Sequence, residues 1–179
     1  MALRLWWLIG MICIINGHGQ LSKTRRGYLR CRTGVTLEVH PDGVINGTKG
    51  KGGKFANLQI IVSKEGRNVT FFGIHSKFYL CMSSDGKLYG SKLMMKECVF
   101  KVLELPYHFT SYYRRIGRRK NLFMGLSRSG KPRWGRQRSK RTQFIWSKSR
   151  NKREYRIKWK PPQLKKQTKN LKKNTNGLL

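Results

Sequence analysis

Basic side chains crowd the segment from Arg114 to Arg141, which contains twelve Lys or Arg residues. Like charges at this density repel one another and destabilise a compact chain, so a polyanion is the natural counter-charge. Guanidinium groups also bind paired anionic oxygens through charge-assisted hydrogen bonds. We therefore predict a polyanion-binding surface built from seven residues around Gly130 and Gly135: Arg128, Lys131, Arg133, Arg136, Arg138, Lys140 and Arg141.

The rest of the chain is also basic. Its 179 residues carry a formal net charge of +33, and Glu154 is the only acidic residue after Arg114. A second basic cluster, from Arg114 to Lys120, either extends the predicted surface or offers a dibasic cleavage site at Arg118-Arg119. This excess of positive charge predicts binding to nucleic acid, an acidic membrane surface or a sulfated polysaccharide.

The first residues favour one of these polyanions. A short positive start is followed by the apolar run Leu5–Ile15 and by small residues at Gly17 and Gly19, which is typical of a secretory signal peptide over residues 1–19. A buried N-terminal element or an uncleaved anchor is the alternative. No other stretch is apolar enough to cross a membrane, so we expect a secreted, extracellular protein without stable membrane insertion. Outside the cell the abundant polyanions are heparan-type glycosaminoglycans, so we expect no nucleic-acid partner.

Two further features are consistent with export. The triplets that begin at Asn46 and Asn68 are N-glycosylation acceptor motifs. Cys13 would leave with the signal peptide, and the three remaining cysteines allow one disulfide and one free thiol, or no disulfide: Cys31, Cys81 and Cys98. A hydrophobic core, rather than a disulfide framework, must therefore stabilise the fold.

An internal repeat predicts how the basic residues are positioned. Three turns contain glycines 43 and 44 residues apart, at Gly43, Gly86 and Gly130. Six positions before each turn glycine is an apolar residue: Leu37, Leu80 and Met124. A second glycine follows each turn: Gly47, Gly90 and Gly135. About fourteen residues after each turn glycine comes another core candidate: Leu58, Phe100 and Phe144.

The segments between the turns are predicted to be strands. They are short, alternating or rich in β-branched and aromatic residues, as in 35–39, 58–62, 68–74, 78–82 and 99–102. Three units of about 43 residues, all of short strands, predict an all-β protein with a β-trefoil fold over residues 27–149. Residues 20–26 form a short extension, and residues 150–179 a basic, mostly disordered tail.

Three groups of motifs within these units resemble the fibroblast growth factors. The resemblance covers roughly residues 27–146 and is most specific in the second unit. It rests on Cys31-Arg32-Thr33-Gly34 with Leu37-Glu38-Val39-His40-Pro41-Asp42-Gly43, on Phe78-Tyr79-Leu80-Cys81-Met82 with Glu97-Cys98-Val99-Phe100, and on Phe123-Met124-Gly125-Leu126 with Gly130-Lys131-Pro132-Arg133-Trp134-Gly135.

The resemblance implies a β-trefoil ligand of a fibroblast growth factor receptor tyrosine kinase, with heparan sulfate as co-ligand and no other cofactor. It places the heparin site on the seven basic residues around Gly130. It implies receptor contacts at Tyr112, Glu104 and Tyr28, and a Cys81–Cys98 disulfide with Cys31 buried. The family's tyrosine before the first cysteine is replaced by Arg30, a departure that suggests an invertebrate or insect-virus member.

Catalysis is not expected. His40, His75 and His108 are scattered, paired carboxylates are absent, and no metal-ligand spacing occurs. A basic secreted ribonuclease, which would use two histidines and a lysine, is a weaker alternative. A β-trefoil lectin is another, but the repeats lack the acidic residues with which such lectins bind neutral sugars. The main alternative is a secreted heparin- or polyanion-binding β-trefoil that does not signal through a receptor.

Overall fold

The structure, a computed structural model, describes residues 23–63, 65–118 and 120–149. The signal peptide expected over residues 1–19 and the tail expected over residues 150–179 lie outside the described residues. Within the described part, no helix is long and apolar enough to span a membrane.

The described residues contain twelve strands and three short 3-10 helices, joined by turns and loops. The strands are β1 (Lys23–Cys31), β2 (Val35–Val39), β3 (Ile45–Lys49), β4 (Leu58–Val62), β5 (Asn68–Gly73), β6 (Tyr79–Met82), β7 (Leu88–Ser91), β8 (Phe100–Glu104), β9 (Thr110–Ile116), β10 (Lys120–Leu126), β11 (Pro132–Gly135) and β12 (Phe144–Lys148). The helices are η1 (Lys54–Ala56), η2 (Lys96–Cys98) and η3 (Lys140–Thr142).

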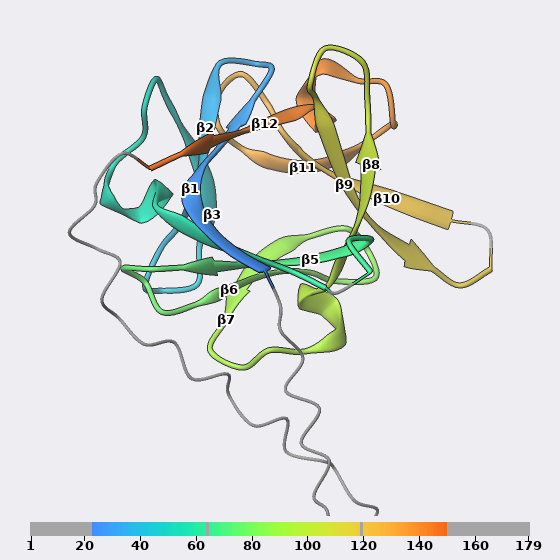
Figure 1. The fold of residues 1–179 in the computed structure, drawn as a ribbon, viewed down its shortest axis with the longest axis horizontal. Coiled ribbons are helices and arrows are strands. Elements are labelled where there is room, and N and C mark those ends of the chain that lie inside the picture. The colour runs from blue at the N-terminus through green and yellow to red at the C-terminus, as the bar shows by residue number, and fades with distance from the viewer. Residues whose placement is uncertain (1–22, 64, 119, 150–179) are drawn as a thin grey trace, which may run out of the picture.

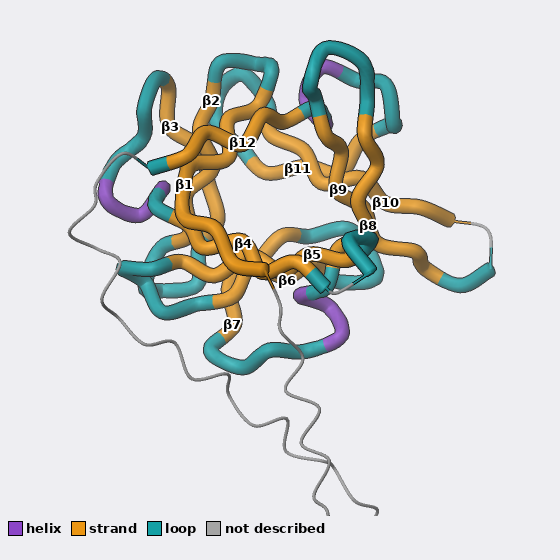
Figure 2. Tube along the Cα trace, in the orientation of Figure 1, coloured by secondary structure: helices purple, strands orange, loops and turns teal. Residues whose placement is uncertain are grey.

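Six of these strands close a barrel. The antiparallel pairs run β1–β4, β4–β5, β5–β8, β8–β9, β9–β12 and β12–β1. The other six form the hairpins β2–β3, β6–β7 and β10–β11, one for each unit of the repeat. Figure 1 shows the hairpins around the barrel strands, and Figure 2 shows the same arrangement as a backbone tube. The buried hydrophobic side chains of these strands form one core cluster. The predicted all-β, β-trefoil fold is confirmed.

The repeat glycines hold the three units together. Gly43, Gly86 and Gly130 all have positive φ, which glycine adopts without steric penalty. The Gly90 N–H donates to Gly43 O at 2.7 Å. A Cβ at Gly86 would lie 2.5 Å from Trp134 Cδ1, and one at Gly130 would lie 1.9 Å from Gly47 O. Each turn therefore packs on another unit, and the three contacts close a cycle.

The core follows the same repeat. The predicted core positions are fully buried: Leu37, Leu80, Met124, Leu58, Phe100 and Phe144. Strand β1 begins at Lys23, four residues before the expected start of the domain, because Lys23 to Gly27 pair with β4. The barrel closes through this additional pairing.

Candidate functional site

The predicted basic residues lie on two neighbouring segments. All seven are exposed, on the turn between β10 and β11, on β11, and on the loop from Arg136 to Arg141 that leads into β12. The glycines of β10 and β11 allow these segments to approach closely. A Cβ at Gly125 would lie 2.9 Å from Arg133 O and 3.1 Å from Arg141 O, and one at Gly135 would lie 2.9 Å from Thr142 Cγ2.

A groove of about 450 Å³ opens between the two segments. We call it the η3 groove, since η3 forms one wall, and its lining includes Arg32, Thr33, Arg128, Ser139, Lys140 and Arg141. Three of the seven predicted residues therefore line the η3 groove, whereas Lys131, Arg133, Arg136 and Arg138 flank it. No acidic residue occurs between Arg114 and Phe144, so the positive potential is not neutralised within these segments.

The backbone of the loop adds to this potential. Carbonyl oxygens of six consecutive residues, 136 to 141, face donors in the protein. Thr142 Oγ1 lies 2.9, 3.2 and 2.9 Å from the carbonyls of Arg136, Gln137 and Ser139. Gln143 Nε2 donates to Arg138 O at 3.2 Å. The Cys31 thiol lies 3.6 and 3.2 Å from Lys140 O and Arg141 O.

The orientation of these carbonyls has an electrostatic consequence. Thr142 and Cys31 are fully or almost fully buried, so the negative ends of the peptide dipoles point inward. The side of the loop that faces solvent carries the basic side chains without competing carbonyl oxygens. Oriented backbone dipoles of this kind favour anions. The arrangement can hold sulfate or carboxylate groups.

Arg32 belongs to this site, although the charge pattern around Gly130 did not include it. Its guanidinium donates to Gln143 Oε1 at 2.7 Å and lies 5.0 Å from the centre of the Phe109 ring. Its backbone N–H donates to Gln143 O at 2.8 Å. Arg32 lies in the turn directly after β1, next to the buried Cys31, and is itself exposed.

The second basic cluster does not join the η3 groove. Strand β12 pairs with Thr110 at the start of β9, whereas Arg115 and Arg118 lie at the opposite end, on the β9–β10 hairpin. Figure 1 shows this hairpin projecting away from the η3 region. Seven strand residues separate the two ends by roughly 20 Å. Arg119 lies outside the described residues.

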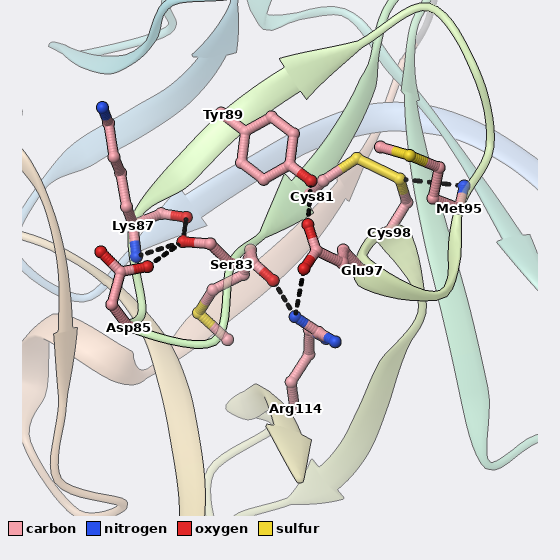
Figure 3. Close-up of polar contacts among 10 residues, drawn as sticks. Cys81, Ser83, Asp85, Lys87, Tyr89, Met95, Glu97, Cys98 and Arg114 are labelled. Carbon is pink, nitrogen blue, oxygen red and sulfur yellow. Dashed lines mark hydrogen bonds and ion pairs between the residues drawn. A yellow bond between two sulfur atoms is a disulfide. The ribbon is translucent and has the colours of Figure 1, made fainter. Parts of the chain in front are cut away.

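Arg114 instead belongs to a polar cluster next to the disulfide (Figure 3). Its Nη1 donates to Met82 O and lies 3.9 Å from Glu97 Oε1, while the Tyr89 hydroxyl donates to Glu97 Oε2. Burial, reinforced by the hydrogen bond to Glu97, raises the pKa of Tyr89 to about 12. These contacts connect the β6–β7 hairpin to β9.

Cys81 and Cys98 form a disulfide in the structure, and Cys31 is a free, buried thiol. The bridge joins β6 to η2 and both of its cysteines are fully buried. The backbone N–H of Met95 lies 3.3 Å from Cys98 Sγ. Since the disulfide lies in the second unit, it does not contribute to the walls of the η3 groove.

Comparison with known proteins assigns the family. The sequence model of the fibroblast growth factor family matches residues 25–145, which is most of the chain. The chain belongs to the fibroblast growth factor family. Members of this family are signalling ligands and not enzymes. The predicted resemblance is thus confirmed at the level of the family.

Individual relatives are about one-third identical to this fibroblast growth factor. Human "Fibroblast growth factor 4" is 35% identical over 117 residues, which are 64% of this chain and 54% of the relative. "Fibroblast growth factor 1" from Cynops pyrrhogaster is 31% identical over 121 residues, covering 67% of this chain and 78% of the relative. "Protein let-756" from Caenorhabditis elegans is 34% identical over 139 residues, covering 70% of this chain and 32% of the relative. The chain spans about half the length of the fibroblast growth factor 4 relatives it matches.

One residue expected to contact a receptor lies in the core. Tyr112 is 3% exposed, and its ring meets Phe71 edge-on at 4.9 Å and Phe144 at 6.1 Å. The expectation that Tyr112 faces a partner is therefore wrong for this structure. Tyr112 packs in the barrel core beside Phe71, which occupies a similar place in the second unit.

The other two expected receptor residues are accessible. Glu104 is exposed at the end of β8, and Tyr28 is half-buried on β1, opposite Ser147 of β12. Strands β9 and β12 separate Glu104 from Tyr28 in the barrel. A more exposed aromatic residue, Tyr107, lies three residues beyond Glu104 and is 84% exposed. Tyr107 was not among the site residues predicted from the sequence. The adjacent Pro106 was the available signal that Tyr107 lies in a loop.

The two glycosylation motifs lie on strands. Asn46 is half-buried on the edge strand β3, and its Oδ1 lies 3.0 Å from His40 Nε2. Asn68 is the half-buried first residue of β5, and its backbone N–H lies 3.3 Å from Ser63 Oγ. Glycosylation at either position stays a prediction.

Proposed function

We propose that this protein is a secreted growth factor that binds heparan sulfate through the η3 groove and activates a fibroblast growth factor receptor tyrosine kinase. The η3 groove is the observation that supports polysaccharide binding. Four cationic side chains line it, and six consecutive carbonyls are turned away from solvent. Membership of the family supports the receptor part.

The mechanism follows from two separate surfaces. Sulfates bind Arg32, Arg128, Lys140 and Arg141 through charge-assisted hydrogen bonds, while the flanking cations add longer-range attraction. A polysaccharide that binds both ligand and receptor raises their effective concentration and promotes receptor dimerisation. The ligand thus needs little contact area of its own for a stable signalling complex.

The receptor surface that we favour includes Glu104 and the adjacent loop. Tyr107 and His108 both have positive φ, at 60° and 62°, which is an uncommon and strained conformation for non-glycine residues. Tyr107 is 84% exposed, and the exposed Glu104 precedes it by three residues in the chain. Tyrosine is among the residues that most often contribute strongly to binding energy at interfaces.

Receptor phosphorylation tests the proposal. Cells with one fibroblast growth factor receptor and no heparan sulfate receive the protein with or without added heparin. We expect phosphorylation that depends on heparin and that falls strongly for the η3-groove variant, Arg128→Gln with Lys140→Gln and Arg141→Gln. The matched control removes three exposed lysines from the second unit, Lys92→Gln with Lys96→Gln and Lys101→Gln, and should behave as the wild type.

Two outcomes would contradict this function. Equal activity of the η3-groove variant and the control would remove the polysaccharide site from the mechanism. No phosphorylation across a panel of receptors that includes invertebrate ones, together with normal heparin binding, would instead favour the alternative of a polyanion-binding β-trefoil without receptor signalling.

A further inference from the structure

Arg32 contacts the η3 groove and the loop between β8 and β9 at the same time. It lines the η3 groove, and its guanidinium lies 5.0 Å from the centre of the Phe109 ring. Phe109 ends the loop over residues 105–109, which we call the β8–β9 loop. We propose that Arg32 couples these two regions, so that a sulfate bound in the η3 groove orders the loop that carries Tyr107. This inference rests on the proposed function and adds a regulation of the same site.

The β8–β9 loop has a backbone conformation that other contacts must maintain. Tyr107 and His108 have positive φ, of 60° and 62°. Residues in this conformation are strained and persist there when the surrounding structure holds them. The Leu105 N–H donates to Phe109 O at 2.8 Å and closes the loop at its base, whereas Tyr107 and His108 are exposed at its tip. The order of the loop therefore depends on how firmly its base is held.

The base of the β8–β9 loop lies against the segment that forms the η3 groove. Thr110, the residue after Phe109, pairs with Phe144 at the start of β12. The buried Ser111 hydroxyl donates to Thr142 O, in η3, at 2.7 Å. Figure 1 shows the β8–β9 loop next to η3 at the top of the view. The groove and the loop therefore belong to one packed region.

Gln143 holds Arg32 between the groove and the loop. Its Oε1 accepts from Arg32 Nη1 at 2.7 Å, and its Nε2 donates to Arg138 O at 3.2 Å. The Arg32 backbone N–H also donates to Gln143 O, at 2.8 Å. Gln143 is only 9% exposed. One buried residue thus fixes the backbone and the side chain of Arg32 relative to the basic segment around Arg138.

The Arg32 guanidinium can keep these contacts while it binds a sulfate. Its five N–H donors lie in the plane of the group, whereas the faces of that plane can stack on an aromatic ring. Gln143 Oε1 accepts from one in-plane donor, and the Phe109 ring lies over the guanidinium carbon. A sulfate in the η3 groove would bind other in-plane donors without displacing Gln143 or Phe109. Binding would therefore fix Arg32 against the loop rather than remove it.

A fixed Arg32 affects the loop through conformational entropy. Arg32 is exposed, so its long side chain has several conformations before a ligand binds. A sulfate that restricts Arg32 over Phe109 also restricts the base of the β8–β9 loop. A receptor that binds the ordered loop then loses less conformational freedom. Coupling between binding sites is reciprocal, so a receptor bound to the loop raises the affinity for polysaccharide by the same factor.

Amide hydrogen exchange of the β8–β9 loop tests this inference. Exchange is followed by mass spectrometry on the full chain, with and without heparin tetrasaccharide at a concentration that calorimetry shows to be saturating for each variant. We expect the tetrasaccharide to slow exchange in residues 105–109 about fivefold or more in the wild type. Arg32→Gln, which removes the guanidinium, and Phe109→Leu, which removes the ring, should abolish this slowing. Arg128→Gln is the matched control, because it also removes one cation from the lining of the η3 groove, and it should keep the slowing.

The other outcomes separate the inference from the proposed function. Unchanged exchange of the loop in wild-type protein that has bound the tetrasaccharide overturns the inference and leaves the polysaccharide site intact. Equal behaviour of Arg32→Gln and Arg128→Gln also overturns it. Equal slowing in the β5–β6 turn, residues 74–78, overturns it in favour of a general stabilisation by bound ligand. If the η3-groove variant binds the tetrasaccharide as the wild type does, the proposed polysaccharide site fails and the inference fails with it. Thermal unfolding of each variant verifies that the fold is intact.

Discussion

At the scale of single residues, Thr142 organises the basic loop without carrying a charge. It is fully buried, and its hydroxyl lies within hydrogen-bond distance of three loop carbonyls. A hydroxyl donates only one hydrogen at a time, so it alternates among these acceptors. Thr142 therefore contacts half of the six oriented carbonyls, and Gln143 and Cys31 contact the other three.

Replacing Thr142 with valine should weaken heparin binding although the net charge does not change. Valine keeps the shape but removes the donor. Arg136 O and Ser139 O still accept from the Ser139 and Thr142 backbone N–H groups, whereas Gln137 O loses its hydroxyl donor. We expect a cost of about 1–3 kcal/mol of unfolding free energy. Salt elution from a heparin column, measured beside a Thr70→Val control in the β5 core, tests this effect. Elution of the Thr142→Val protein at the wild-type salt concentration would show that the carbonyl orientation is irrelevant to binding.

Tyr112 gives the unfolding free energy a distinct pH dependence. Burial, partly offset by a hydrogen bond with Thr110, raises the pKa of Tyr112 to about 12 from its ordinary value of 10. The folded state thus favours the neutral phenol, and this contribution is complete below pH 10 and lost as the pH rises towards 12. The loss approaches about 2–3 kcal/mol.

The Tyr112→Phe variant should lack this alkaline loss. Denaturant unfolding at several pH values between 8 and 12 would measure the difference in unfolding free energy between the wild type and the variant. We expect the difference to be constant below pH 10 and then to shift in favour of the variant. Lysine deprotonation affects both proteins and cancels. A difference that stays constant to pH 12 would mean that Tyr112 ionises as freely as in the unfolded chain.

At the scale of elements, the β10–β11 turn is fixed by its contact with β3. Gly130 has φ of 82°, and a Cβ there would lie 1.9 Å from Gly47 O. The turn that carries Arg128 and Lys131 is therefore positioned by the first unit of the repeat. Backbone atoms cannot rotate away as a flexible side chain can, so a larger residue must move the whole turn.

Gly130→Ala should destabilise the protein more than Gly34→Ala. Gly34 also has a positive φ, of 87°, but no atom lies within 4 Å of the position that an added methyl group would take. The conformational penalty alone costs about 1–2 kcal/mol in both variants, and overpacking adds about 1–3 kcal/mol at Gly130. Chemical denaturation of both variants gives the comparison. Equal losses would indicate that the turn moves without strain.

At the scale of the whole molecule, the net charge of +33 opposes the compact state. Most of the charged side chains in the described part of the chain are exposed cations, and their repulsion extends over about 10 Å at 0.1 M salt. A bound polyanion both neutralises this repulsion and stabilises the folded state by mass action. Stability and function are thus coupled through the same surface.

Heparin should raise the unfolding temperature of the full chain. At a concentration one hundred times its Kd, a ligand adds about 2.7 kcal/mol to the unfolding free energy. Calorimetric scans at low and high salt, with uncharged dextran as the control polymer, measure the effect. We expect a large shift with heparin at low salt, a smaller one at high salt and none with dextran. A shift with dextran would point to crowding rather than to charge.

The fold was predictable because its determinants are local and repeated. Turn glycines at Gly43, Gly86 and Gly130 require positive φ, and apolar positions at fixed offsets from them mark the core. The density of cations around Gly130 likewise predicted where the basic surface lies. Such features can be recognised from the sequence because each depends on a few neighbouring residues.

The roles of several single residues were not predictable in this way. Tyr112 and Tyr113 are adjacent, and a shift of one residue in strand register exchanges which ring faces the core. The pairing of β8 with β9 places Tyr112 inward, opposite Val102. Motif resemblance alone could not choose between the two, and its assignment of Tyr112 to a partner surface was wrong.

The sequence by itself thus determined the all-β trefoil, the core positions, the family and the general location of the basic surface. Only the tertiary structure decided that Arg32 joins this surface, that its guanidinium lies over Phe109, and that the loop carbonyls point inward. These arrangements depend on contacts such as Cys31 Sγ with Arg141 O, 110 residues apart in the chain. They form only when β12 closes the barrel against β1, because pairing between distant strands sets which side chains and peptide dipoles meet.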